Sequence, residues 1–326
     1  MSEPPAPTRT LRSALVVGYG FIGRHVARAL VRRGVATTVL TRSAVAGAEL
    51  PGARFVAGSA CERALLDRAL HGAEHVFFTA GGLFAAESNA DPIADTQLAL
   101  PPLLTVLEAL RARPGVGLTF LSSGGVVYGN PRYLPVDEAH PTNPISSYGI
   151  LKLTAEKYVS MYAELYGMGA DVLRCSNVYG EGQPSERGQG AVAAFLARLQ
   201  RREAITLFGD GSVVRDFLYV GDLVDAMIGL AERPHGGLRL CNVGSGEATR
   251  IDRLIVLLSA ITGLAAKIES KPARGFDVGQ VVLEVSALRR HVDFRPLSIE
   301  DGLRRTIAAA ARGAASDSYA PTRSTV

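Results

Sequence analysis

Tyr148 and Lys152 are the residues whose types and spacing first suggest chemistry. They lie four positions apart in the run YGILKLTAEKYVSMYAEL, which has the pattern of a helix, and residues four apart share one helical face. A tyrosine hydroxyl, with an ordinary pKa of about 10, exchanges protons poorly at neutral pH, and a neighbouring ammonium group favours its anion. The pair predicts an acid–base tyrosine assisted by a lysine, although this spacing is also common by chance.

A glycine-rich turn near the N-terminus predicts where a cofactor lies. The segment ALVVGYGFIGRHVARAL holds Gly18, Gly20 and Gly23 in the pattern G-x-G-x-x-G, between an apolar strand and a helix. The first glycine permits a tight turn, the second lets backbone approach a pyrophosphate, and the third allows close helix–strand packing. The helix N-terminus, with Phe21 and Ile22 in its first turn, supplies free N–H groups to the anion. The segment predicts a dinucleotide-binding site.

The end of the second predicted strand bears on which dinucleotide binds. A site for NAD places an Asp or Glu about 20 residues after the glycines, against the ribose 2′-hydroxyl. Here the strand ends VLTRS, with Arg42 and Ser43 and no carboxylate. A guanidinium and a hydroxyl attract a 2′-phosphate, whereas an acid would repel it. We therefore expect NADP as the cofactor, with NAD as the alternative if Arg42 is an ordinary surface residue.

Strands and helices alternate through the first half of the chain. Amphipathic helical patterns separate short apolar runs at 14–18, 36–40, 53–58, 75–80, 118–123 and 171–177. Such strands indicate a parallel sheet covered on both faces, so the predicted fold class is α/β with a doubly wound (Rossmann) sheet. Ligands of this fold sit beyond the carboxyl ends of the strands, and we expect Ala80 and Gly81, at one such end, to contact the cofactor.

The organisation loosens in the second half. We expect a cofactor-binding domain over 13–176 and a smaller substrate-binding lobe over 177–312, partly interleaved because some of its segments return to the main sheet. Residues 1–12 and 313–326 lack hydrophobic periodicity and are expected to be disordered tails.

Composition argues against several classes of protein. The 326 residues carry a net charge of +4, but the arginines are scattered and no basic block of the kind that grips nucleic acid or anionic lipid occurs. No apolar run reaches the ~18–20 residues of a membrane-spanning helix, and the N-terminus lacks a signal-peptide core. Three isolated cysteines argue against a disulfide framework. We expect a soluble cytoplasmic protein, with His71 and His75 as solvated surface residues rather than metal ligands.

Further motifs, taken with those above, resemble the extended short-chain dehydrogenase/reductases, specifically the NAD(P)-dependent nucleotide-sugar epimerase/dehydratase family. They span about residues 14–310 and are, in chain order, GFIGRHV, SSGGVVYG, SSYGILK, LRCSNVYGEGQ, LFGDGSVVRDFLYVGDLVDA, CNVGSGEAT and RGFD. The resemblance implies an enzyme that oxidises or reduces a hexose ring carbon, usually C4. Tyr148 would exchange a proton with the sugar oxygen, and Lys152 would also hold the nicotinamide ribose.

The resemblance implies substrate contacts and a partner as well. Asn177 would touch the nucleotide-sugar substrate, and Arg215 and Arg274 would engage its diphosphate or nucleotide, a role that suits permanently charged bidentate donors. The alternative for the arginines is that each merely pairs with a nearby acid, Asp216 or Asp277. The family pattern also implies a homodimer that packs through the catalytic helix and the helix LLTVLEALR.

The chain departs from the family pattern in three places. Its glycine loop is one residue shorter than the usual G-x-x-G-x-x-G. Gly124 occupies the usual position of a catalytic Ser or Thr, so Ser123 is the candidate for the hydrogen bond to the sugar oxygen, with Ser122 behind it as a substrate contact. Either hydroxyl could instead bond backbone at the strand end. Ser59 replaces the Asp that often meets the adenine.

The same motifs favour one reaction over others. Where dehydratases of the family carry an Asp-Glu pair, this chain has Gly125 and Val126, which transfer no protons, so dehydration is disfavoured. Arg42 favours an NADPH-dependent reductase of a nucleotide-linked 4-keto-6-deoxyhexose, with Tyr148 as proton donor. An NAD-dependent nucleotide-sugar 4-epimerase would use the same catalytic residues and is the alternative. A non-enzymatic nucleotide-sensing regulator is a remote third hypothesis, because it would be expected to lack the Tyr–Lys pair.

Overall fold

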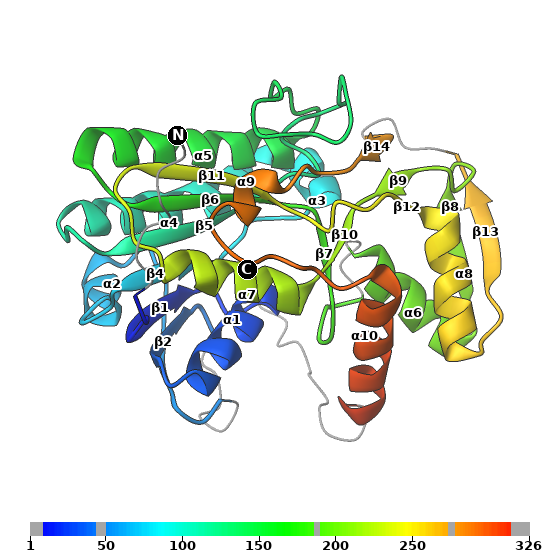
Figure 1. Cartoon of the computed structure of the whole chain (residues 1–326), viewed down its shortest axis with the longest axis horizontal. Helices are drawn as coiled ribbons and strands as arrows, with labels where there is room; N and C mark the ends of the chain where they lie inside the picture. The colour runs from blue at the N-terminus through cyan, green and yellow to red at the C-terminus, as the bar shows by residue number, and fades with distance from the viewer. Residues whose placement is uncertain (1–8, 44–49, 186–189, 273–277, 314–326) are drawn as a thin grey trace.

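A seven-stranded parallel sheet forms the centre of the molecule (Figure 1). The computed structural model describes residues 9–43, 50–185, 190–272 and 278–313. Across the sheet the strands lie in the order β11 (Leu238–Val243), β6 (Ala170–Cys175), β5 (Gly117–Ser123), β4 (His75–Phe78), β1 (Ser13–Val17), β2 (Ala36–Thr41) and β3 (Ala53–Ala57). The order reverses direction between β1 and β4, and in such sheets ligands bind at this switch point, beyond the carboxyl ends of the strands.

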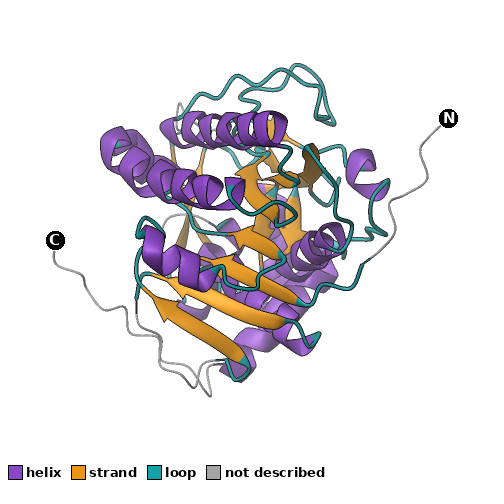
Figure 2. Ribbon diagram, turned by 90° about the vertical axis from the view of Figure 1, so that its left-hand side faces the viewer, coloured by secondary structure: helices purple, strands orange, loops and turns teal. Residues whose placement is uncertain are grey.

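Helices cover both faces of the sheet, as the sequence predicts (Figure 2). Helices α1 (Phe21–Arg32) and α7 (Val220–Ala231) contact each other and share one hydrophobic core. The other core is shared by α2 (Arg63–Ala69), α4 (Pro92–Arg111) and α5 (Ser147–Tyr166). Strand β1 shows the alternation that feeds both cores, because Val16 belongs to the first and Leu15 and Val17 to the second. The doubly wound fold class is confirmed.

Helix α4 is long and apolar enough to cross a membrane, by length and composition alone. In the structure it packs against α5. Its Leu103, Val106 and Leu107 are fully buried in the second core. The apolar character of α4 is therefore explained by its place in a helical layer of the sheet.

The smaller lobe lies at one end of the sheet, at the right of Figure 1. It contains α6 (Ala191–Arg201), α8 (Ile251–Thr262), α10 (Ile299–Gly313) and the parallel pair β8 (Ala204–Phe208) and β13 (Lys267–Lys271). Short elements connect it to the main sheet: β7 (Asn177–Tyr179), β9 (Val214–Arg215), β10 (Phe217–Tyr219), β12 (Thr249–Arg250), β14 (Gln280–Val281) and α9 (Ser286–Arg289). The short helix α3 (Ala85–Ala90) instead packs against α4 and α5. The two halves are interleaved, because β11 comes from the second half of the chain and pairs with β6.

Two expectations about the surface are wrong in part. Residues 9–12 of the expected N-terminal tail are attached to the domain: Leu11 is buried, and the side chains of Arg9 and Arg12 bond Glu74 at 2.7 and 2.8 Å. Gly313, expected to begin the C-terminal tail, is the last residue of α10, and the remaining tail residues, 1–8 and 314–326, lie outside the described part of the chain.

His75 is not a surface residue. It lies in the central strand β4, is only 4% exposed, and its Nε2 is 2.8 Å from Thr119 Oγ1. Burial lowers the pKa of His75 to about 4, so the ring is neutral at physiological pH. Within the described residues no group of three His, Cys, Asp or Glu side chains could hold a metal ion.

Candidate active site

The glycine loop joins β1 to α1 at the carboxyl edge of the sheet, and its three glycines differ in what surrounds them. Gly18 has φ +98°, and a Cβ there would lie 2.7 Å from the backbone nitrogen of Ala80. A Cβ on Gly23 would lie 2.1 Å from the carbonyl oxygen of Gly18, whereas one on Gly20 would meet nothing within 4 Å. Gly18 and Gly23 therefore allow close packing, and Gly20 leaves open space above the helix N-terminus.

This open space fits the pyrophosphate of a dinucleotide. Gly20 is the N-cap of α1, no acidic residue lies in the first turn, and Phe21 and Ile22 begin the helix. The first N–H groups of a helix have no partner within it, and with the helix dipole they attract an anion. A loop one residue shorter than the family pattern thus still presents a helix N-terminus with room above it.

The catalytic candidates meet at the same edge of the sheet. Ser146 caps α5 by accepting a hydrogen bond from the N–H of Gly149 at 3.2 Å, which places Tyr148 in the first turn. Ser123 is the last residue of β5, and its hydroxyl is hydrogen-bonded to that of Tyr148. The Lys152 Nζ donates to the carbonyl of Leu121 at 2.8 Å and lies 5.7 Å from the centre of the Tyr148 ring.

A small cavity is lined both by the catalytic candidates and by the residues expected to contact the cofactor. Tyr148 and Lys152 line it together with Ala80, Gly81 and the buried carboxylate of Asp95. The constellation predicted from separate motifs is thus assembled in one place, beside the glycine loop.

The protonation of Tyr148 differs from the sequence expectation. Burial, followed by the proximity of Cys175 and Asp95, raises the pKa of Tyr148 above its ordinary value, although the Ser123 hydrogen bond acts in the opposite direction. Burial also lowers the pKa of Lys152. The ammonium group of Lys152 therefore does not outweigh desolvation, and Tyr148 holds its proton at neutral pH, in the form that donates a proton.

Ser122, expected behind Ser123 as a substrate contact, is turned to the opposite face of β5. Successive residues of a strand alternate in direction. The Ser122 hydroxyl donates to Glu156, which accepts a 2.7 Å hydrogen bond from Arg174. All three side chains are buried. Ser122 thus belongs to a buried ionic network, and Ser123 is the hydroxyl that meets Tyr148.

Gly124, at the position where the family usually has the serine, is closely packed. A Cβ at Gly124 would lie 2.7 Å from the side chain of Leu283 and 3.0 Å from the carbonyl oxygen of Arg174. A serine at the usual family position would have to displace the end of the Leu283 side chain, whereas Ser123 already reaches Tyr148.

Asp95 is a site residue that sequence reasoning missed. It is 1% exposed, and its Oδ1 accepts a 2.6 Å hydrogen bond from the N–H of Leu83. Its Oδ2 is buried and has no hydrogen-bond partner among the described residues. A buried acceptor without a partner is costly, so this oxygen fits a hydroxyl or amide donor of a bound cofactor. One signal was available: an aspartate one turn inside an otherwise apolar helix.

Two of the residues expected to contact the substrate, Asn177 and Arg215, are hydrogen-bonded to backbone carbonyls. Asn177 begins β7, and its Nδ2 donates to the carbonyl of Asp216 at 3.1 Å. Arg215 donates to the carbonyls of Val214 and Gly279 at 2.9 and 3.2 Å. The Asp216 carboxylate bonds the backbone N–H groups of Ser245, Gly246 and Leu283. Arg274 lies outside the described residues.

Arg42 and Ser43 follow β2 and are exposed. Ser59 follows β3, where its N–H donates to the carboxylate of Glu62 at 3.1 Å and its hydroxyl accepts from the N–H of Cys61. An acid that the strand-end pattern did not reveal therefore stands beside this loop, contributed by the start of α2. The strand end carries a cation, and the neighbouring loop carries an anion.

Known proteins resemble the chain over nearly its whole length. A model of the NAD dependent epimerase/dehydratase family matches residues 14–244. The chain is 30% identical over 295 residues to a putative UDP-glucose 4-epimerase of Methanocaldococcus jannaschii, covering 89% of this chain and 95% of that one. It superimposes on the UDP-glucose 4-epimerase of Thermotoga maritima, solved with UDP-glucose, with a TM-score of 0.86 and 32% identity, covering 92% and 99% of the two chains.

A further solved relative holds a dinucleotide. It is the UDP-glucose 4-epimerase of Thermus thermophilus in complex with NAD, at 32% identity and a TM-score of 0.84, with 92% of this chain and 99% of that one covered. The glycine loop, the Ser–Tyr–Lys cluster and these similarities lead to one conclusion: the chain belongs to the NAD-dependent epimerase/dehydratase family, and is an extended short-chain dehydrogenase/reductase enzyme of nucleotide sugars.

Proposed function

We propose that the protein is a nucleotide-sugar 4-epimerase, which inverts C4 of a hexose carried on a nucleoside diphosphate. The observation that carries the proposal is the Ser123–Tyr148–Lys152 cluster beside Ala80 and Gly81. It stands in a chain similar, end to end, to proteins described as UDP-glucose 4-epimerases. This favours the alternative of the sequence analysis over the 4-ketoreductase, whose support is Arg42 and the catalytic residues that both reactions share.

The cluster can move a proton to and from the sugar O4. Tyr148 lies within hydrogen-bond reach of Ser123, so both hydroxyls can meet one sugar oxygen. Because burial raises the pKa of Tyr148, the phenol is the resting form, and the nearby Lys152 ammonium stabilises the phenolate that forms when Tyr148 serves as a base. The glycine loop, Ala80 and Gly81 would hold NAD, which would supply the hydride acceptor.

We propose NAD, retained through the catalytic cycle, as the cofactor. An epimerase oxidises C4 and returns the same hydride, so it gains nothing by releasing the dinucleotide. The opposing argument is Arg42, which suits the 2′-phosphate of NADP. Arg42→Asp decides between them. If NAD is the cofactor, the nucleotide released from the purified protein should be NAD in both the wild type and the variant. An NADP-selective wild type that loses NADP in the variant would overturn the choice of cofactor.

We further propose a homodimer in the cytoplasm. Helix α5 exposes a row of large apolar side chains, Ile150, Tyr158, Met161 and Leu165, each at least 36% exposed. Their spacing places them along one side of the helix. An exposed apolar stripe of this kind is typical of a protein–protein interface. Sedimentation equilibrium of wild type and of Met161→Glu/Leu165→Glu tests it: the variant should be monomeric, and a monomeric wild type would contradict the proposal.

The activity test compares two kinds of substrate. Purified protein incubated with UDP-glucose should yield UDP-galactose without net consumption of NADH or NADPH, followed by chromatography of the sugar nucleotides. Stoichiometric oxidation of NADPH by a nucleotide-linked 4-keto-6-deoxyhexose, with no interconversion of saturated sugars, would establish the reductase instead. Tyr148→Phe is the matched inactive control for either reaction.

A further inference from the structure

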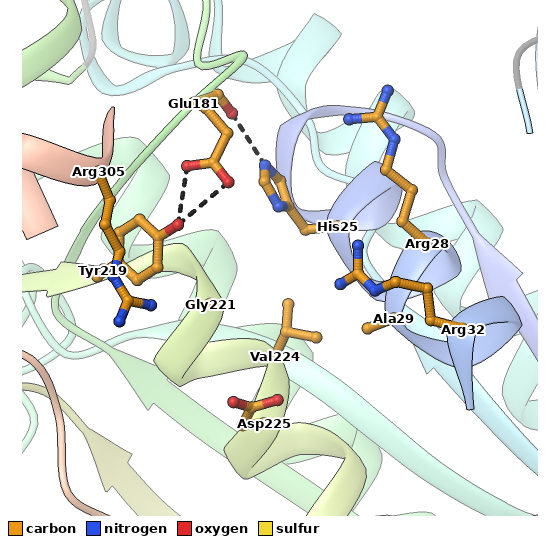
Figure 3. Close-up of a pocket in the computed structure, with 10 residues that line it drawn as sticks. All are labelled: His25, Arg28, Ala29, Arg32, Glu181, Tyr219, Gly221, Val224, Asp225 and Arg305. Carbon is orange, nitrogen blue, oxygen red and sulfur yellow. Dashed lines mark hydrogen bonds between the residues drawn. The ribbon is translucent and has the colours of Figure 1, made fainter. Parts of the chain in front are cut away.

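A second cavity, of about 260 Å³, lies between α1 and α7 and shares no lining residue with the cavity at Tyr148 and Lys152 (Figure 3). Arg32 of α1 and Arg305 of α10 lie on opposite sides of the space in Figure 3, with Val224 of α7 between them. Asp225 lies on the rim. Helices α1, α7 and α10, strand β10 and the segment after β7 therefore all contribute to this cavity.

Positive charge predominates on the cavity wall. Its cations are the guanidinium groups of Arg28, Arg32 and Arg305, and its anions are the carboxylates of Glu181 and Asp225. Both carboxylates are already engaged. Glu181 accepts from the hydroxyl of Tyr219 at 3.0 Å, and Asp225 pairs with Arg33, outside the cavity, at 2.7 Å.

Arg28 and Arg32 are the unusual members of the wall. Neither forms an ion pair or hydrogen bond within the described part of the chain. They lie one helical turn apart on α1, and like charges at this spacing repel each other. An anion between α1 and α10 would remove this repulsion and give both groups a partner.

The remaining wall sets the class of ligand. Burial lowers the pKa of His25, whose Nε2 donates to the carbonyl oxygen of Glu181 at 2.9 Å, so the positive charge of the wall near neutral pH comes from its arginines. Arginine recognises phosphate through paired N–H donors. The cavity volume of about 260 Å³ is several times the ~30 Å³ that a water molecule occupies in the liquid, so the cavity has room for more than a bare phosphate. Val224 and Ala29 supply an apolar surface for the rest of the ligand.

We propose that this cavity is a binding site for a small phosphate monoester, whose phosphate lies between Arg32 and Arg305 with Arg28 at the rim. The site is separate from the nucleotide-sugar crevice. The proposal is independent of the epimerase assignment, because binding at this cavity is measured without turnover.

The test titrates the full-length protein with inorganic phosphate and with glycerol 3-phosphate by calorimetry, at constant ionic strength, with and without saturating UDP. We expect one saturable site that UDP leaves unchanged. Arg32→Gln/Arg305→Gln should weaken binding at least tenfold. Arg304→Gln is the matched control, since Arg304 neighbours Arg305 on α10 but faces Glu300 and Asp301 and does not line the cavity.

Asp225→Asn gives a result that a damaged fold cannot imitate. It removes a carboxylate from the rim, and the side chain of Asp225 is 71% exposed, so the fold should tolerate the change. Phosphate should then bind more tightly, by about fivefold for one unit charge at this range in a high-dielectric surface. Unchanged binding in the double arginine variant, weaker binding in Asp225→Asn, or displacement of phosphate by UDP would each overturn the proposal.

Discussion

The buried pair of Glu156 and Arg174 should control both stability and the geometry of the active site. Arg174 donates to Glu156 through Nε at 3.1 and 3.2 Å and through Nη2 at 2.7 Å, and each residue is 5% exposed. Glu156 lies one turn after Lys152 on α5, and it also accepts from Ser122, the neighbour of Ser123. The pair therefore fixes α5 to β6, and the bond from Ser122 ties the same carboxylate to β5, the strand that ends in the candidate catalytic Ser123.

The expected magnitude for Glu156→Gln follows from these contacts. The amide keeps the size of the side chain but removes its charge and points an N–H₂ group at donors of Arg174, leaving a buried guanidinium uncompensated. Removing one partner of a buried ion pair costs about 3–5 kcal/mol. Since a domain is stable by about 5–15 kcal/mol, the variant should fold at 25 °C but with a much lower urea midpoint.

A second buried pair provides the matched control. Asp171 stands at the other end of β6, is 2% exposed, and accepts a 2.5 Å hydrogen bond from Arg239. Asp171→Asn should cost a similar amount of stability and leave kcat unchanged. Glu156→Gln should lower kcat by about tenfold or more, because small misplacements of reacting groups are expensive. Urea unfolding and steady-state kinetics at 25 °C provide both numbers.

Two outcomes would refute this reasoning. If Glu156→Gln lost less than about 1 kcal/mol of stability, the buried Arg174 charge would still be compensated in the variant, which contradicts the reasoning. An equal fall of kcat in Glu156→Gln and Asp171→Asn would mean that general destabilisation, and not the placement of α5, lowers activity. Glu156→Leu/Arg174→Met adds a check, because it should recover stability without recovering kcat.

Three further predictions concern single residues. Tyr148→Phe should lower kcat by about 10²–10⁴-fold while leaving bound dinucleotide unchanged, and retained turnover would exclude it as the proton carrier. Gly23→Ala should destabilise by about 1–3 kcal/mol, since its Cβ would lie 2.1 Å from the Gly18 carbonyl, whereas Gly20→Ala should lose cofactor and keep the melting temperature of the cofactor-free protein. The pKa of His75 falls from 6.5 to about 4 on folding. Stability present above pH 6.5 is therefore lost as pH falls toward 4, by about 3 kcal/mol in all. His75→Gln should remove that part of the slope in urea titrations, and an unchanged slope would contradict it.

The sheet was predictable because its strands are buried on both faces. The predicted runs at 36–40 and 118–123 match β2 and β5 to within one residue at each end. Each such strand is a continuous apolar segment between amphipathic helices, so its position can be read from the local sequence alone. Strand β11 was not located, because the apolar run of LRLCNV (238–243) is interrupted by Arg239 and Asn242 and follows a helix of the second half. Its partner β6 is distant in sequence, and nothing local reveals the pairing.

The site was predictable where a motif fixes both spacing and position. Tyr148, Lys152, Ala80 and Gly81 meet in one cavity as expected. Ser122 and His75 were misplaced because periodicity does not say which face of a strand is outward when both faces are buried. Asp95 and the Glu156–Arg174 pair depend on tertiary contacts between elements that lie far apart along the chain.

The pairing of β11 with β6 has a consequence for how the protein can be made and divided. The edge of the sheet beyond β6 is closed only by residues 238–243, which leave the ribosome after some sixty further residues have been synthesised. Until then the nascent chain carries an unpaired strand edge of the kind that recruits other chains. A fragment ending at residue 176 would keep that edge permanently, so the boundary that separates the two lobes along the chain is a poor place to cut.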